Sequence, residues 1–345
     1  MRTALLLFAA AGAACVSPLN TSHADSSPPP AYALVIHGGA GYPSRDMSPE
    51  QYAGLTSGMQ GALSAGLASL EGGAPALDVV ELVIQILESD SNFNSGVGAV
   101  CTANGGHELD ASIMDGETLA CGAVGGVTTV EHPIALARLV MEETRHVLFV
   151  ADGAEAFADS LGDRVSRVPN SFFDTERTKA SLKALLDRRA DESASKTADD
   201  SDPNEIKGTV GCVVLDSYGH LAAGTSTGGL TGKSFGRIGD SPIIGAGTYA
   251  DDETCAISCT GVGEEYIRYA VARDISARME YLGMGVAEAC DVVIHEVLKP
   301  GDGGVIGIDR QGNVAMSFNT TGMVRAVGNS QGRFDVGIWE GFEDL

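Results

Sequence analysis

The chain reads GTVGCVVLD from Gly208 to Asp216, and its character changes sharply there. The run before it, DRRADESASKTADDSDPNE at about 187–205, has no aliphatic residue larger than alanine and predicts a solvated linker without regular structure. TVGCVVLD is mostly β-branched and apolar, which predicts a buried strand. This strand opens on a threonine that directly follows a glycine.

A threonine in this position is a candidate nucleophile. Its hydroxyl is weak alone, but cutting the chain just before Thr209 would free an α-amine that can act as the base. Gly208 suits such a cut, because glycine tolerates the strained backbone of a scissile peptide. The alternative is that Gly208 and Thr209 merely end a linker and begin a strand.

Further motifs follow in order after this threonine: TVGCVVLDSYGHLAAGTSTGG, GRIGDSPIIGAGTYADD and SCTGVGEEYIR. VIHGGAG near residue 36, FNSGVGAV near 95 and HELDASIMDG near 110 precede it. Together they resemble the N-terminal-nucleophile asparaginases, the plant-type L-asparaginase and isoaspartyl peptidase family. The resemblance spans about Ala33 to Gly337, and several separate motifs in order are far more specific than one glycine-rich loop.

The resemblance implies catalytic roles for the matching residues. Thr209 would be the nucleophile, exposed by self-cleavage after Gly208, and Thr227 of TSTGG would orient it by a hydrogen bond. Thr260 and Gly261 of CTGVGEE would form the oxyanion hole, with Gly261 also giving the substrate carbonyl room to approach. The structural alternatives are a strand-end threonine at Thr227 and a helix N-cap at Thr260.

The substrate-binding residues implied are Arg237, Asp240 and Asn94. Arg237 and Asp240 carry opposite charges three residues apart in GRIGDSP. An amino-acid head group presents a carboxylate, which suits the planar fork of arginine, and an ammonium, which suits aspartate. A surface ion pair is the alternative for these two residues. Asn94 of FNSG matches an active-site asparagine of the family.

The loop before and around Asn94 resembles the family's sodium loop, in which main-chain carbonyls hold a monovalent cation. Its middle, residues 89–92, reads SDSN and does not match the family's typical residues. No other cofactor is expected. His37 of HGGAG is interpreted as structural. The carbonyls predicted to hold sodium are those of Leu87, Glu88, Phe93, Ser95 and Val97.

Composition limits the partners of this chain. Its 345 residues carry a formal net charge of −24, with 44% hydrophobic residues. This charge disfavours nucleic acid and anionic membranes as partners. The run GGLTGKS at 228–234 resembles a phosphate-binding P-loop, but Thr227 stands where the motif requires its first glycine, so nucleotide binding is not expected.

The N-terminus predicts a signal peptide at 1–24 and export, to the periplasm. Arg2 precedes the apolar run ALLLFAAAGAAC, and Ser22-His23-Ala24 offers a small-x-small cleavage site. Lipidation at Cys15 is the alternative, and it alone would place the mature protein on a membrane. The remaining cysteines lack C-x-x-C spacing, which makes metal sites weak candidates and leaves disulfide pairing open.

The order of elements predicts the fold class. Strands are expected at AYALVIHGG, GVGAVCT, LDASIM, LACGAVGGV and CAISCT, and a hairpin over GVIGIDRQGNVAMSFNT. Helices are expected near 50–70, 76–89 and HPIALARLVMEE, and from about Glu264. This α+β pattern predicts two antiparallel sheets face to face with helices outside, a four-layer αββα sandwich that the resemblance also implies. The helix from Glu264 would bury one stripe, Ile267, Val271, Ile275, Met279 and Leu282.

The resulting expectation is a single hydrolase domain at 25–345, cleaved into an α subunit (25–208) and a β subunit (209–345). It would hydrolyse β-aspartyl dipeptides and the side-chain amide of L-asparagine, and the resemblance implies a homodimer of αβ units. Two alternatives stay open: an aspartylglucosaminidase-like amidase, and an uncleaved binding protein of the same fold. The sequence does not rank asparagine against isoaspartyl peptides.

Overall fold

The structure is a computed structural model that describes residues 28–41, 45–194 and 208–342. The predicted signal segment 1–24 with Cys15 lies outside the described residues, as does the part of the predicted linker from 195 to 205. Within the described ranges, no helix has the length and apolar character needed to cross a membrane.

The described strands form two sheets, which are antiparallel except where β3 runs parallel to β4. The larger has the order β12-β11-β1-β5-β6-β2-β3-β4 and the smaller the order β10-β9-β8-β7. Most strands fall where the sequence predicts them. Their bounds are β1 Ala33–Ala40, β2 Leu109–Asp115, β3 Cys121–Val127, β4 Leu148–Val150, β5 Val210–Leu215, β6 Leu221–Thr227, β7 Thr248–Ala250, β8 Cys255–Gly261, β9 Gly303–Asp309, β10 Val314–Phe318, β11 Met323–Asn329 and β12 Phe334–Gly337.

The described helices include those predicted near 50–70, 76–89 and 133–143. The first begins where Ser48 caps it and Pro49 occupies the first turn, with Gln51 completing a capping box. Their bounds are α1 Pro49–Glu71, α2 Ala76–Glu88, α3 Pro133–Glu143, α4 Ala151–Ser160, α5 Glu176–Ala194, α6 Gly263–Tyr269, α7 Val271–Leu282 and α8 Val286–Val292.

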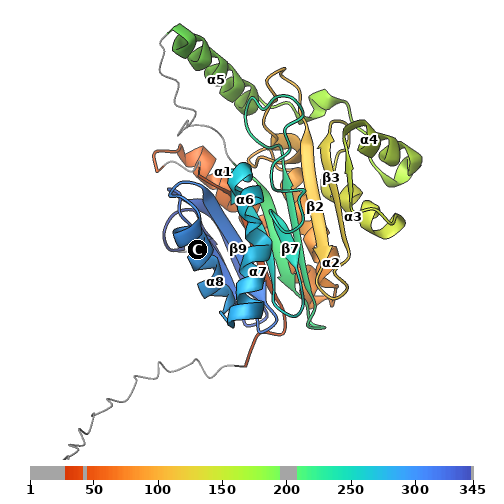
Figure 1. Cartoon of the computed structure of the whole chain (residues 1–345), viewed down its shortest axis with the longest axis vertical. Helices are drawn as coiled ribbons and strands as arrows, with labels where there is room; N and C mark the ends of the chain where they lie inside the picture. Colours follow the sequence, from red (N-terminus) through yellow and green to blue (C-terminus); the bar gives the residue numbers. More distant parts are fainter. Residues whose placement is uncertain (1–27, 42–44, 195–207, 343–345) are drawn as a thin grey trace, which may run out of the picture.

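Three buried clusters hold these elements together. Leu34 and Ile36 of β1 pack with residues of α1, α2 and α3 on one face of the larger sheet. Val35 of β1, on the opposite face, packs against Ile306 and other residues of the smaller sheet. The smaller sheet packs its outer face on α7 and α8 through residues such as Ile257. The predicted mixed α and β architecture is confirmed, and Figure 1 shows α5 projecting away from the sheets.

Three local predictions are wrong. GVGAVCT is no strand, because its first residues close a short 3₁₀ turn at Gly96–Gly98. The predicted linker does not begin at 187, because α5 continues to Ala194. The predicted long helix from Glu264 is broken at Ala270, whose left-handed backbone (φ 49°) ends α6 and begins α7. Two residues of its expected apolar stripe, Ile267 and Leu282, are consequently exposed.

The position of Thr209 follows from the sheet. It directly precedes β5, which is fully buried between β1 and β6 in the larger sheet. The residues that follow it are paired on both sides, Val210 with Ser226 and Gly211 with His37. The sheet therefore holds the backbone next to Thr209 in one place, and Thr209 is 7% exposed.

Candidate active site

Two threonine hydroxyls and a backbone carbonyl form the centre of the site. The Thr209 hydroxyl donates to Thr227 Oγ1 at 3.0 Å, and the Thr227 hydroxyl donates to the Gly208 carbonyl at 3.1 Å. Thr227 Oγ1 also accepts the Gly229 N–H at 3.0 Å, so its orientation is fixed. The two hydroxyls thus connect the candidate nucleophile to the carbonyl oxygen of the peptide bond that precedes it.

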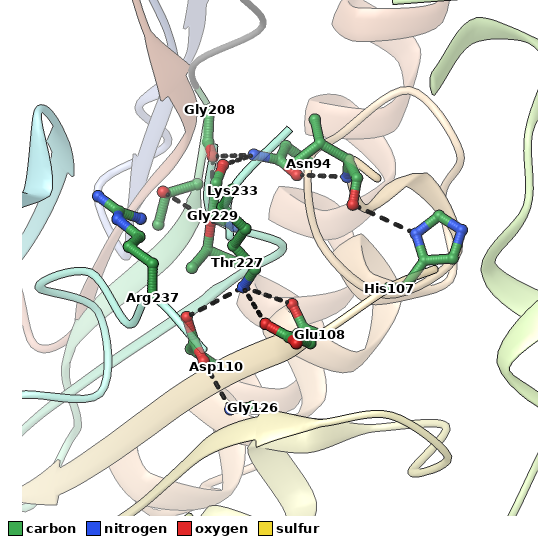
Figure 2. A network of polar contacts seen from close by, with 12 residues as sticks. Asn94, His107, Glu108, Asp110, Gly126, Gly208, Thr227, Gly229, Lys233 and Arg237 are labelled. Atoms are coloured by element: carbon green, nitrogen blue, oxygen red, sulfur yellow. Dashed lines mark hydrogen bonds and ion pairs between the residues drawn. The ribbon is translucent and has the colours of Figure 1, made fainter. Parts of the chain in front are cut away.

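Asn94 holds the same carbonyl from the other side, as Figure 2 shows. Its Nδ2 donates to Gly208 O at 2.6 Å and to Gly229 O at 2.8 Å. Its Oδ1 accepts from Val100 N, which fixes the amide. The Gly208 carbonyl therefore has two donors, an arrangement that stabilises negative charge developing on its oxygen.

The sequence predicted that Arg237 and Asp240 lie together at a substrate pocket, and the structure brings both to the same pocket as Thr209. Lining residues are Gly208, Thr209, Thr227, Gly229, Leu230, Arg237, Gly239, Asp240, Ser241 and Gly261. Arg237 makes its bidentate ion pair with Glu264, through Nε and Nη2 at 2.9 Å each, and its Nη1 faces Gly229. Sequence reasoning missed this carboxylate, which orients the guanidinium plane.

Asp240 is buried beside this guanidinium and its Oδ2 has no hydrogen-bond partner among the described residues. Burial raises the pKa of Asp240 to about 7, and the charge of Arg237 opposes that rise. Gly263 leaves room for both groups, since a Cβ there would lie 2.9 Å from Arg237 Nη2 and from Asp240 Oδ1. An unsatisfied buried carboxylate in a pocket is suited to an ammonium ligand.

Thr260 and Gly261 lie at the end of β8, just before α6. Gly261 lines the pocket, and a side chain there would overlap the Asp302 carbonyl, so only glycine fits. Thr260 is fully buried and its hydroxyl oxygen accepts from Ala40 N at 3.2 Å. Since that oxygen serves as acceptor here, the Thr260 hydroxyl proton remains available for donation.

His37 is a residue that sequence reasoning left out of the chemistry. Its Nδ1 lies 2.9 Å from the Thr209 carbonyl oxygen and its Nε2 lies 3.0 Å from Ser258 Oγ. Burial lowers the pKa of His37 to about 3, so the ring is neutral. Gly211 makes this approach possible, because a side chain there would overlap the imidazole. His37 therefore fixes the backbone of the candidate nucleophile without carrying charge.

The side chain of Glu88 is a second feature that the sequence did not indicate. It is fully buried at the end of α2 and accepts from Ser226 Oγ at 2.6 Å, while Ser226 Oγ lies 2.7 Å from Ser95 Oγ. His132 and the Ile134 N–H supply further contacts to the carboxylate. Glu88 thus ties the Asn94 loop to β6 next to Thr227.

The P-loop-like run and the cysteines are the remaining features that the sequence singled out. Lys233, in the run that resembles a P-loop, is buried and donates to the Glu108 carbonyl at 2.8 Å. The six cysteines in the described residues are free, and Cys121 is the one that is partly exposed. Within the same ranges no group of three or more His, Cys, Asp or Glu residues has the geometry to hold a metal ion.

Comparison with known proteins identifies the family. Residues 30–338 match the family model described as "Asparaginase". The chain is 47% identical over 310 residues to the isoaspartyl peptidase of Salmonella typhimurium, an alignment that covers 89% of this chain and 98% of the relative. It is 45% identical over 327 residues to a probable isoaspartyl peptidase/L-asparaginase 2 of Arabidopsis thaliana, covering 90% and 99%. The human isoaspartyl peptidase/L-asparaginase is 39% identical over 307 residues, covering 88% and 95%. The chain belongs to the asparaginase family whose members include isoaspartyl peptidases.

Proposed function

We propose that this protein is an amidohydrolase that cleaves β-aspartyl peptides and the side-chain amide of L-asparagine. The observation that carries the proposal is the pocket shared by Thr209, Arg237 and Asp240. It combines a hydroxyl nucleophile with a guanidinium for an α-carboxylate and a carboxylate for an α-ammonium. β-Aspartyl peptides and asparagine share that head group and carry their amide on the side chain.

The nucleophile becomes active through self-cleavage. Thr209 Oγ attacks the Gly208 carbonyl carbon, and the Thr227 hydroxyl takes its proton while donating its own to the Gly208 oxygen, as the two hydrogen bonds permit. Asn94 donates to the same oxygen and stabilises the negative charge that develops on it before the relayed proton arrives. When the C–N bond breaks, that proton passes to the threonine nitrogen, the acyl group moves from nitrogen to oxygen, and water hydrolyses the ester. The products are a Gly208 carboxylate and a free α-amine on Thr209.

Substrate hydrolysis then uses the same hydroxyl. The neutral α-amine of Thr209 accepts the hydroxyl proton as Oγ attacks the side-chain carbonyl of the substrate. Thr260 and the backbone around Gly261 stabilise the oxyanion, and the amine leaves with a proton from the Thr209 ammonium. Water attacks the acyl-enzyme and releases aspartate. Helices cover the outer face of each sheet, which supports an αββα sandwich of the N-terminal-nucleophile hydrolase type. The proposed mechanism is the one expected for that fold.

Gly228 favours this activity over that of an aspartylglucosaminidase. That branch tends to carry asparagine at the matching position. A Cβ on Gly228 would lie 2.6 Å from Asn94 Oδ1 and 2.7 Å from the Ala99 Cβ, so a larger residue would displace the asparagine that holds Gly208 O.

The pH dependence of KM tests the substrate site. Asp240 binds the substrate ammonium only when ionised, and its pKa is about 7. As pH falls from 8 to 6, the ionised fraction falls about tenfold, and KM for L-asparagine should rise by about that factor. The measurement is aspartate release against substrate concentration at each pH. A cleaved protein that releases aspartate from neither L-asparagine nor β-aspartyl-leucine would contradict the function. A KM that is constant over this range would remove Asp240 from the ammonium site.

Sodium is proposed as a structural ion of the Asn94 loop, held by main-chain carbonyls. A side chain at Gly96 would overlap Glu88 O and one at Gly98 would overlap Phe93 O, so the loop packs these two predicted ligands closely against its glycines. The guanidinium of Arg177 also contacts this loop, donating to Ser91 O at 2.8 Å and to Phe93 O at 3.4 Å. Carbonyl oxygens are suitable ligands for a hard cation. The ion would hold the loop in shape and take no part in the chemistry.

Removal of sodium should therefore lower the thermal midpoint of the cleaved protein. Exchange of NaCl for choline chloride at constant ionic strength should reduce Tm by a few degrees, since binding to the native state stabilises it by mass action. Differential scanning calorimetry at several sodium concentrations provides the measurement. Equal Tm values in the two salts would exclude the sodium site.

A further inference from the structure

A buried charge cluster of Lys233, Asp110 and Glu108 lies beside Thr227 (Figure 2). The side chain of Lys233 is 1% exposed, and its Nζ lies 3.8 Å from Asp110 Oδ2 and 3.9 Å from Glu108 Oε2. The Asp110 side chain is fully buried; its Oδ1 accepts from Gly126 N, while Oδ2 has no hydrogen bond among the described residues. Burial raises the pKa of Asp110, and the Lys233 ammonium opposes that rise.

Asp110 is placed next to the nucleophile by the sheet register. It lies directly opposite Thr227 in the pairing of β2 with β6. Residues opposite each other in an antiparallel pair point to the same face, with Cβ atoms about 5 Å apart. Thr227 Oγ1 is the acceptor for the Thr209 hydroxyl. The Asp110 carboxylate therefore lies close enough to the Thr209 α-amine, which cleavage would expose, for its charge to shift the pKa of that amine.

Lys233, which belongs to the predicted β subunit, also lies close to Thr227. A Cβ on Gly229 would lie 3.1 Å from Lys233 Nζ and 3.4 Å from Arg237 Nη1, so both cations border this glycine. Gly229 in turn donates to Thr227 Oγ1. The positive charge of Lys233 and the negative charge of Asp110 thus act on the nucleophile from one side.

The α-amine of Thr209 can act as a base only when it is neutral. A nearby carboxylate stabilises the ammonium form, and a nearby cation stabilises the neutral form. A single charge some 7 Å away moves such a pKa by roughly one to two units at an effective dielectric constant near 20. Asp110 alone would therefore leave most of the amine protonated at neutral pH.

We propose that Lys233 and Asp110 form a compensated charge pair that sets the basicity of the Thr209 α-amine. Neither side chain touches the reacting atoms, so both act through the amine. The proposal rests on the proposed function, because the amine exists only after cleavage at Gly208. The pair also joins the two segments that cleavage would separate, since Asp110 precedes Gly208 and Lys233 follows it.

Other charged or titratable groups face the nucleophile. Arg237 and Asp240 line its pocket, and Glu264 neutralises Arg237. His37 contacts the Thr209 carbonyl and is neutral, because burial lowers its pKa to about 3. The Glu88 carboxylate accepts a hydrogen bond from Ser226, which lies between it and the nucleophile. Because Asp240 titrates in the same range, a kinetic pH profile mixes its ionisation with that of the amine, and the amine must be measured directly.

The experiment is competitive labelling of the α-amine with acetic anhydride across pH. The labelled N-terminal peptide of the β subunit, which begins at Thr209, is quantified by mass spectrometry. Lys233→Met removes the cation and leaves Asp110, so the midpoint of labelling should move roughly one to two pH units upward. Asp110→Asn leaves the cation, so the midpoint should move downward by a similar amount. The double variant should return close to the wild-type midpoint.

Matched controls use an ion pair of the same chemistry elsewhere. Lys183 and Asp187 are exposed partners on α5, 2.5 Å apart, and Lys183→Met and Asp187→Asn should leave the midpoint unchanged. Glu108→Gln provides a variant that avoids a buried charge change, because the Glu108 side chain is 31% exposed. It should mature normally and move the midpoint downward by less than Asp110→Asn.

Opposite shifts in the two single variants support the proposal. Shifts in the same direction, or no shift in either variant, overturn it, because a purely structural pair would not produce opposite signs. If the buried variants fail to mature, Glu108→Gln decides, and an unchanged midpoint there overturns the proposal. Absence of any peptide beginning at Thr209 in the wild type would instead refute the proposed function.

Discussion

Thr209→Ala should yield a single uncleaved chain without β-aspartyl hydrolase activity. The substitution removes the hydroxyl that attacks the Gly208 carbonyl, so neither the acyl shift nor the free α-amine can form. Nucleophile and base are lost together, and we expect kcat to fall by at least about 10⁴-fold. Denaturing gel electrophoresis measures cleavage, and aspartate release from β-aspartyl-leucine measures activity.

Thr209→Ser is the matched control, because it keeps the hydroxyl and removes one methyl group. It should cleave more slowly than wild type and retain measurable activity. The methyl group restricts the side-chain rotamer, so its loss weakens the alignment with Thr227 Oγ1. A Thr209→Ala protein that still releases aspartate would show that the nucleophile lies elsewhere.

Arg237→Ala should reduce kcat/KM for β-aspartyl substrates by about 10²-fold or more and leave self-cleavage intact. The substrate α-carboxylate loses its bidentate partner, a charged hydrogen-bonding group in a mostly buried pocket. The Gly208–Thr209 peptide presents no free α-carboxylate, so its cleavage does not need this arginine. Steady-state kinetics and the cleaved fraction, measured on the same preparation, separate the two effects.

Arg237→Lys should rescue poorly. Glu264 occupies Nε and Nη2 of the guanidinium, and the remaining donors serve the substrate. A lysine ammonium has no planar fork, so it cannot donate to Glu264 and to the substrate carboxylate in the same plane. Arg333→Ala is a control of the same type, since Arg333 forms an ion pair with Asp335 at 2.7 Å on β12. Wild-type kinetics for Arg237→Ala would place the head group at another site.

The structure brings Thr209, Thr227, Arg237 and Asp240 to one pocket. The sequence singled these residues out because each belongs to a short motif beside a strand end or a glycine-rich turn, but it did not indicate their partners. Glu264 and Asp110 were not found, because their roles depend on partners distant along the chain. Lys233, for example, contacts Glu108, which lies 125 positions away. Such pairings depend on sheet order, which a motif does not encode.

The errors in secondary structure have local causes. GVGAVCT is apolar and β-branched, but Gly96 has φ 51° and the turn closes with hydrogen bonds from Gly98 N to Ser95 O and from Ala99 N to Gly96 O. The lack of large apolar residues after 187 indicates that the segment is exposed, but it does not exclude a helix. The end of α5 was therefore predicted too early. That helix continues on charged residues, supported by pairs such as Lys183 with Asp187 four positions on. The left-handed Ala270 carries no sequence signal.

The proposed mechanism depends on cleavage of the chain by itself between Gly208 and Thr209. Mass spectrometry of the purified wild-type protein under denaturing conditions, combined with an activity assay on the same sample, measures this cleavage. We expect two chains, one ending at Gly208 and one with the mass of residues 209–345, in a preparation that releases aspartate from β-aspartyl-leucine. An active preparation that consists wholly of intact chain would exclude self-cleavage as the source of the nucleophile.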